Sequence, residues 1–89
     1  MDRAEALSLA KKELDSIRQA GYGAAAEHID TVQQKCVTDD SGHGYDLEVS
    51  YLWEDLEHEN ILVICRVTSK TWFAHERLEA SVTLAASAA

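Results

Sequence analysis

Apolar and polar residues alternate over ten positions in the middle of the chain, and this pattern fixes much of the possible architecture. Every second side chain is apolar: Tyr45, Leu47, Val49, Tyr51 and Trp53. Successive side chains of a β-strand point to opposite faces of a sheet, so the apolar set shares one face. We therefore predict a strand over residues 45–54 that turns its Tyr and Trp side chains toward a core.

An amphipathic helix is predicted before this strand, over residues 3–20. Its apolar side chains recur at helical spacing and are Leu7, Ala10, Leu14 and Ile17. Asp2 and Glu5 match a capping box at the start, and Gly21 permits the positive φ that ends many helices. A second, short helix is expected over residues 24–29.

Three further segments have strand character. Residues 31–38 and 61–69 are rich in Val, Ile, Thr and Cys, and residues 72–84 keep most apolar side chains on one parity. A helix over 74–86 is the alternative for the last segment. The connections are shorter than the crossovers of parallel strands. The predicted fold class is α+β, with the N-terminal helix packed on one face of a four-stranded antiparallel meander sheet.

Length and charge narrow the possible roles. The 89 residues fit one domain, which we place at residues 1–84, and the small residues 85–89 form a tail expected to fray. The formal charge of −8 disfavours direct binding to nucleic acid or to an anionic membrane. No signal peptide or span-length apolar run is recognisable, so we expect a cytoplasmic protein.

Chemistry-bearing residues form no recognisable catalytic motif. Cys36 and Cys65 lack redox or zinc spacing, and both are predicted to be buried thiols, because free cysteine is usually buried. The four histidines could supply a base, but no orienting group or oxyanion site accompanies them. We expect no catalytic residue, cofactor or metal, and the sequence favours a non-enzymatic protein.

An acidic turn is predicted between the second and third strands. Its carboxylates are Glu54, Asp55, Glu57 and Glu59. They lack the spacing and the glycine of an EF-hand, so we expect a solvated turn. A partner-facing acidic patch and a divalent-cation site are the alternatives.

The third strand carries apolar residues on both parities. Ile61, Val63, Cys65 and Val67 share one face, whereas Leu62 and Ile64 lie on the other, and one helix covers only one side of a sheet. Large exposed apolar patches often mark association. We therefore predict a protein-interaction module that forms a homodimer, or binds another protein, through the outer sheet face. The predicted interaction residues are Leu52, Leu62, Ile64, Arg66 and Trp72.

Two other functions remain open at this point. One is a small-molecule-binding or catalytic domain with a pocket between helix and sheet near Tyr22, Tyr51 and Trp53. The other is an acidic mimic of nucleic acid that occupies a basic protein.

A motif within residues 37–67 resembles a family of small bacterial proteins. It reads Val-Thr-x-x-Ser-Gly-x-x-Tyr-x-Leu-Glu-Val from Val37 to Val49, followed by Trp53-Glu54-Asp55 and a β-rich segment. The resemblance is to small uncharacterised bacterial α+β proteins, and it covers about a third of the chain. Those proteins commonly carry a proline-containing tail, whereas this chain has no proline. The resemblance transfers no activity or functional residue.

Overall fold

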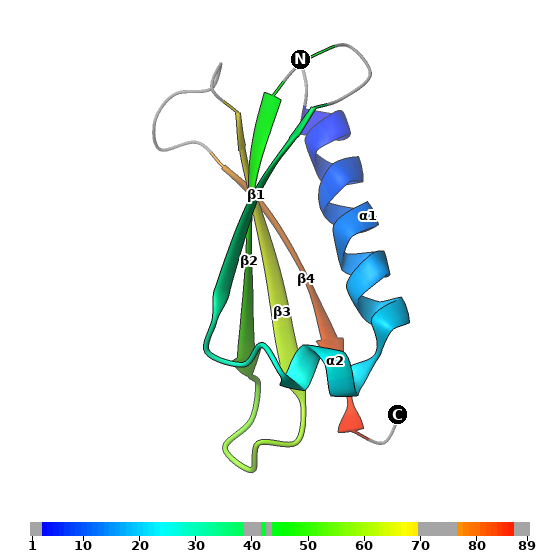
Figure 1. Ribbon diagram of the computed structural model, residues 1–89, viewed down its shortest axis with the longest axis vertical. Helices are drawn as coiled ribbons and strands as arrows, with labels where there is room; N and C mark the ends of the chain where they lie inside the picture. The colour runs from blue at the N-terminus through cyan, green and yellow to red at the C-terminus, as the bar shows by residue number, and fades with distance from the viewer. Residues whose placement is uncertain (1–2, 39–41, 43, 70–76, 87–89) are drawn as a thin grey trace.

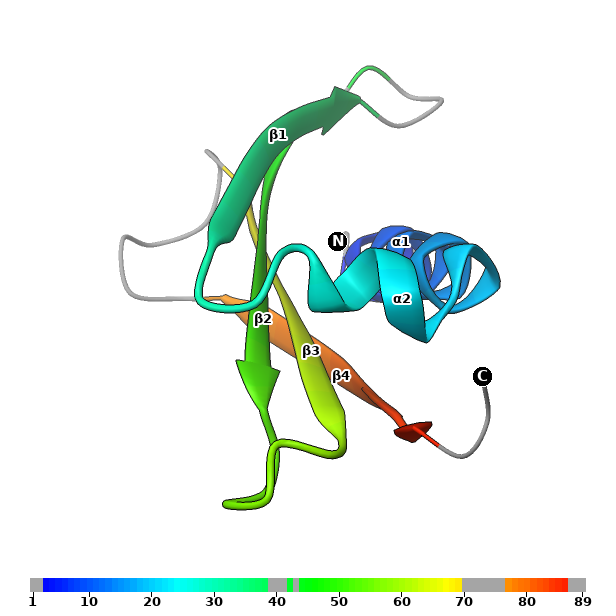
Figure 2. The ribbon, with the colours of Figure 1, turned by 60° about the horizontal axis from the view of Figure 1, so that its bottom comes forward.

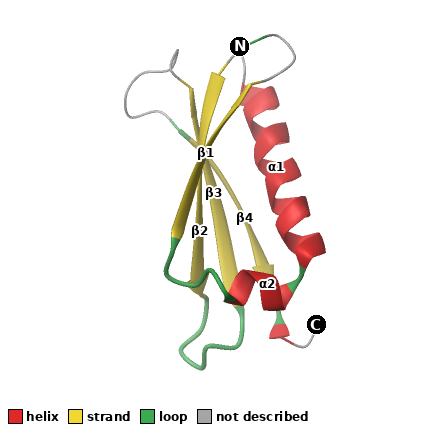
Figure 3. Ribbon diagram, viewed as in Figure 1, coloured by secondary structure: helices red, strands yellow, loops and turns green. Residues whose placement is uncertain are grey.

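The computed structural model, which describes residues 3–38, 42, 44–69 and 77–86, has the predicted α+β architecture (Figure 1). Its elements are α1 (Arg3–Ala20), α2 (Tyr22–Ala26), β1 (Val32–Thr38), β2 (Gly44–Trp53), β3 (Ile61–Ser69) and β4 (Leu78–Leu84). The strands form one sheet in the order β1-β2-β3-β4, each antiparallel to its neighbour (Figure 3). The prediction of a helix on a four-stranded meander is confirmed.

Helix α1 packs on the sheet through small side chains. Its buried residues are Ala6, Ala10 and Leu14, and Leu9 and Ile17 pack partly buried at the edge of the same core. Leu7, predicted for this stripe, is only half-buried because the buried stripe runs through Ala6 instead. Gly21 follows the helix with φ 96°, a conformation that favours glycine, so the predicted stop is confirmed. Asp2 lies outside the described residues.

The core lies between α1 and the inner face of the sheet. Its strand residues are Tyr45, Leu47, Val49, Tyr51, Ile61, Val63, Cys65, Val67 and Leu84, as the alternation predicts. Both helices lie on the same side of the twisted sheet (Figure 2), and α1 contacts β3 and β4. Strand β1 is consequently exposed on both faces, and only Val37 within it is half-buried.

Two elements differ in extent from their predictions. Helix α2 begins at Tyr22 rather than residue 24, because the Gly21 carbonyl accepts the first helical bond from the Ala25 amide at 3.2 Å. Strand β4 pairs with β3 from Leu78 to Leu84, so the alternative of a terminal helix is wrong for these residues. The expected start of this strand at Trp72 lies outside the described residues.

Candidate interaction surface

The outer face of the sheet lies opposite α1 and carries the side chains that the core does not use. Paired residues of neighbouring strands form rows of side chains that run across the sheet. One row runs Val32, Ser50, Ile64 and Ser81, and the next runs Gln34, Glu48, Arg66 and Glu79. A third row pairs Leu52 with Leu62 and Thr83. The face therefore divides into an apolar half and a polar half.

The apolar half gathers four large side chains. Val32 and Leu52 are 56% and 40% exposed, and Leu62 and Ile64 are half-buried. Ser50 is buried beside them although neither described helix covers this side, which shows how closely its neighbours surround it. The four side chains, which we call the apolar group, are Val32, Leu52, Leu62 and Ile64.

A ladder of charged side chains crosses the polar half. Arg66 donates from Nη1 to Glu48 Oε1 at 3.1 Å and from Nε to Glu79 Oε2 at 2.6 Å. These bonds, first to Glu79 and then to Glu48, raise the pKa of Arg66 above its ordinary value. Gln34 donates to Glu48 at 3.4 Å, and Arg77 lies 3.7 Å from Glu79. The ladder links the side chains of β2, β3 and β4 across the outer face.

Arg66 is expected to stabilise the sheet through this ladder. Replacing Arg66 by Met should lower the free energy of unfolding by about 1 kcal/mol, because Glu48 and Glu79 lose their shared cation while remaining partly exposed to water. Urea denaturation at low ionic strength measures the effect. The difference should shrink at about 1 M salt, where charge interactions are screened, and a difference independent of salt would contradict an ionic origin.

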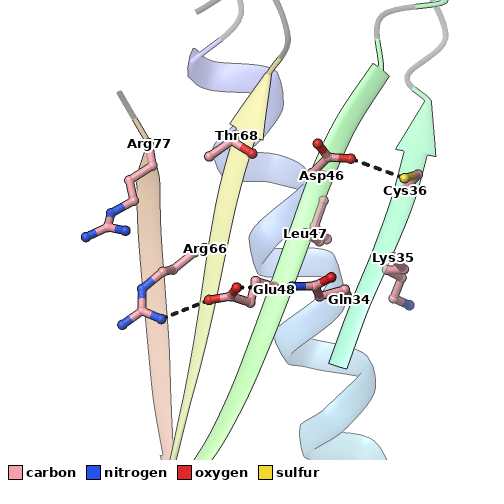
Figure 4. A pocket seen from close by; sticks show the side chains of 9 residues that line it. All are labelled: Gln34, Lys35, Cys36, Asp46, Leu47, Glu48, Arg66, Thr68 and Arg77. Carbon is pink, nitrogen blue, oxygen red and sulfur yellow. Dashed lines mark hydrogen bonds and ion pairs between the residues drawn. The ribbon is translucent and has the colours of Figure 1, made fainter. Parts of the chain in front are cut away.

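A shallow cavity of about 560 Å³ lies over the polar half (Figure 4). Arg66 and Arg77 occupy one side of it, and Gln34, Cys36 and Asp46 occupy the other. The Cys36 thiol lies 3.1 Å from Asp46 Oδ1 and donates a hydrogen bond to it. The cavity thus has two guanidinium groups on one side and carboxylate, amide and thiol groups on the other, where Lys35 also lines it.

The prediction that both cysteines are buried is wrong for Cys36. Cys65 is fully buried, and burial raises the pKa of its thiol to about 11. Cys36 is exposed because it lies on the outer face of the edge strand β1, on the side of the sheet opposite α1. Cys65 is therefore a poor nucleophile at neutral pH, since the thiolate is the reactive form.

Two of the aromatic residues predicted to line a ligand pocket, Tyr51 and Trp53, each contact a histidine ring instead. The Tyr51 ring lies 5.2 Å from His28, and its hydroxyl donates to Gln33 Oε1 at 3.4 Å. Burial raises the pKa of Tyr51. Trp53 stacks on His58 with an interplanar angle of 7°. Tyr22 lines a separate cavity at the end of α1. Another cavity, of about 300 Å³, lies between α1 and the first two strands and is lined by Leu9, Lys12, Glu13, Ser16, Val37, Thr38 and Leu47.

Several hydrogen bonds hold the acidic turn over residues 54–60. The Asp55 carboxylate accepts bonds from the Asn60 amide at 3.1 Å and the Glu59 amide at 2.9 Å, and these bonds lower the pKa of Asp55. Glu54 accepts a bond from the Thr83 hydroxyl at 2.8 Å. Glu57 is exposed. Among the described residues, no group of three or more His, Cys, Asp or Glu side chains is arranged to hold a metal ion.

The structure brings together four of the five predicted interaction residues. Leu52, Leu62, Ile64 and Arg66 lie on the outer face, and Trp72 lies outside the described residues. Val32 belongs to the same group and was not predicted, although its even parity in a strand could have placed it there. Leu56, which is 96% exposed at the acidic turn, was not predicted to have a role either.

Comparison with models of known protein families, with curated proteins and with solved structures finds no significant match to this chain. Within the described part of the chain, no helix combines the length and apolar character needed to cross a membrane.

Proposed function

We propose that the protein is a non-enzymatic interaction module that binds a second copy of itself through the outer face of its sheet. The observation that carries the proposal is the apolar group on the side of the sheet opposite α1. Leu52 and Val32 are large apolar side chains left accessible to solvent, and they adjoin Leu62 and Ile64. Burial of such side chains is the main driving force of association.

The charge of the outer face favours a second copy as the partner. The whole chain has sixteen acidic and eight basic residues. The polar half has two arginines, Arg66 and Arg77, against the carboxylates of Asp46, Glu48 and Glu79. A second copy therefore meets less like-charge repulsion at this face than the overall charge implies.

A two-fold arrangement buries the apolar half of the outer face and leaves the polar half at the edge of the contact. In an isologous interface the same patch occurs on both copies, so the apolar group of one copy covers that of the other. Sheets that pack face to face lie about 10 Å apart. The charged ladders then flank this contact, where water reaches them, and form its polar rim.

Charged substitutions in the apolar group test this proposal. Leu62→Asp and Ile64→Asp should convert a dimer into a monomer, because each buries an unpaired carboxylate in the contact. Light scattering over a concentration series gives the mass, and circular dichroism checks that each variant folds. Ser16→Asp, an exposed position on α1, is the matched control and should leave the dimer intact. Unchanged association of both sheet variants would remove the outer face as the interface.

A further inference from the structure

An exposed leucine lies at the tip of an ordered loop. Leu56 is 96% exposed within the acidic turn between β2 and β3. The turn is closed by a bond from the Glu54 amide to the Asn60 carbonyl at 2.8 Å. Its neighbours also hold it: the Tyr22 hydroxyl donates to the Glu59 carbonyl at 2.8 Å. The loop therefore presents Leu56 to solvent and covers no part of the core with it.

A cavity lies at the same end of the molecule. It measures about 380 Å³ and is lined by Arg18, Gly21, Tyr22, Thr83, Leu84 and Ala85. Most of these contribute apolar atoms, and Arg18 is the charged residue among them. An apolar cavity of ~150 Å³ already accepts a group as large as benzene, so a leucine side chain fits this volume.

The loop and the cavity are placed for a reciprocal contact. Figure 1 shows the β2–β3 loop extending beyond the sheet next to the ends of α1 and β4. Within one copy, the turn is joined to two residues that line the cavity by the bonds from Tyr22 to Glu59 and from Thr83 to Glu54. A two-fold rotation about the viewing direction sets the loop of each copy opposite the cavity of the other. Two copies related in this way form a pair that is closed at this contact, because each loop and each cavity is used once.

The charges around the cavity and on the acidic turn favour the turn of a second copy as the segment that enters the cavity. Leu56 is flanked by Asp55 and Glu57, and the turn contains no Lys or Arg. Arg18 has a side chain that is 61% exposed, and its contact with Asp15 is a loose one of 4.0 Å. A loop that enters the cavity from a second copy brings its carboxylates toward this guanidinium.

We infer that Leu56 of each copy inserts into the cavity at the ends of α1 and β4 of a second copy, with Arg18 facing the acidic turn. This end-to-end contact uses residues separate from the outer sheet face and does not depend on that proposal. If both contacts form, the assembly is larger than a dimer.

Substitutions at Leu56 and Arg18 test the inference. Light scattering over a concentration series should show that Leu56→Asp weakens association about ten- to a hundredfold, because a leucine no longer enters the apolar cavity. Arg18→Glu should weaken it as well, and adding Glu57→Arg to Arg18→Glu should restore part of the loss by reversing the charge pair. Both positions are exposed, so circular dichroism should show an unchanged fold.

The control and the opposing results separate this contact from the sheet contact. Ser8→Asp adds the same charge at an exposed position near the start of α1 and should leave association unchanged. The series is repeated with Ile64→Asp present, so that only the end-to-end contact is measured. Association in that background that Leu56→Asp does not weaken, or that Ser8→Asp weakens equally, overturns the inference. A wild-type protein that stays monomeric throughout the series overturns it too.

Discussion

Replacing Leu47 by Ala is expected to lower the free energy of unfolding by about 2–5 kcal/mol. Leu47 is 2% exposed on the inner face of β2 and pairs across the sheet with Val67. Its truncation removes apolar burial and leaves a cavity that the close-packed core fills only in part. Domains of ordinary stability unfold with about 5–15 kcal/mol, so the loss is a large share of the total. Urea denaturation followed by tryptophan fluorescence and circular dichroism measures it.

The matched control is the same substitution, Leu to Ala, at an exposed leucine. Leu56→Ala should change the free energy of unfolding by no more than about 0.5 kcal/mol, since Leu56 is 96% exposed. The comparison is made at a dilution where light scattering reports a monomer, so that association does not contribute. Similar losses for the two variants would contradict the placement of Leu47 in the core.

The sheet was predictable because its pattern is local and repeated. The alternation in β2 assigns Tyr45, Leu47 and Val49 to the inner face regardless of what packs on them. Short connections then allow only antiparallel neighbours. Leu62 and Ile64, which break the alternation of β3, pointed correctly to a second face with apolar character.

The lateral position of α1 was not predictable, and this accounts for the exposed inner face of β1, whereas Cys36 is exposed because it lies on the outer face. A helix is about 10–12 Å across, whereas four strands spaced about 4.8 Å apart span more than this width. The helix therefore covers part of the sheet, and no residue pattern indicates which part. It lies over β3 and β4, which leaves β1 exposed. An ion pair of 2.9 Å between Glu13 and Lys35 connects α1 to this uncovered strand.

The candidate surfaces also could not be predicted from the sequence, because they depend on contacts between residues far apart in the chain. The sequence indicates that the acidic turn is polar, but it does not show that Leu56 points away from the core. That orientation depends on bonds between distant residues, such as Tyr22 with Glu59 and Thr83 with Glu54. The structure also places Arg18 and Leu84 around one cavity although they are far apart in the chain.

Alkaline pH is expected to destabilise the protein through Cys65. Burial raises the pKa of this thiol from 9.0 to about 11, so the folded state retains its proton while the unfolded state loses it. Stability due to this group is fully present below about pH 9 and falls as the pH rises through 11. Two pKa units correspond to a loss approaching about 3 kcal/mol. Urea denaturation at pH 8, 9, 10 and 11 measures the slope.

The two cysteines provide the control for this pH dependence. Burial also raises the pKa of Tyr51, so ionisation of Tyr51 at alkaline pH destabilises the folded state as well. The slope of the wild-type protein alone therefore does not isolate the effect of Cys65. Cys65→Ala removes the buried thiol and should flatten the decline between pH 9 and 11. Cys36→Ala removes the exposed thiol instead, and comparing the two variants assigns the slope to one cysteine or the other. Equal slopes for wild type and Cys65→Ala would show that burial of Cys65 does not control its protonation. A flatter slope for Cys65→Ala alone would link the position of α1 over β3 to the chemistry of the thiol that it covers.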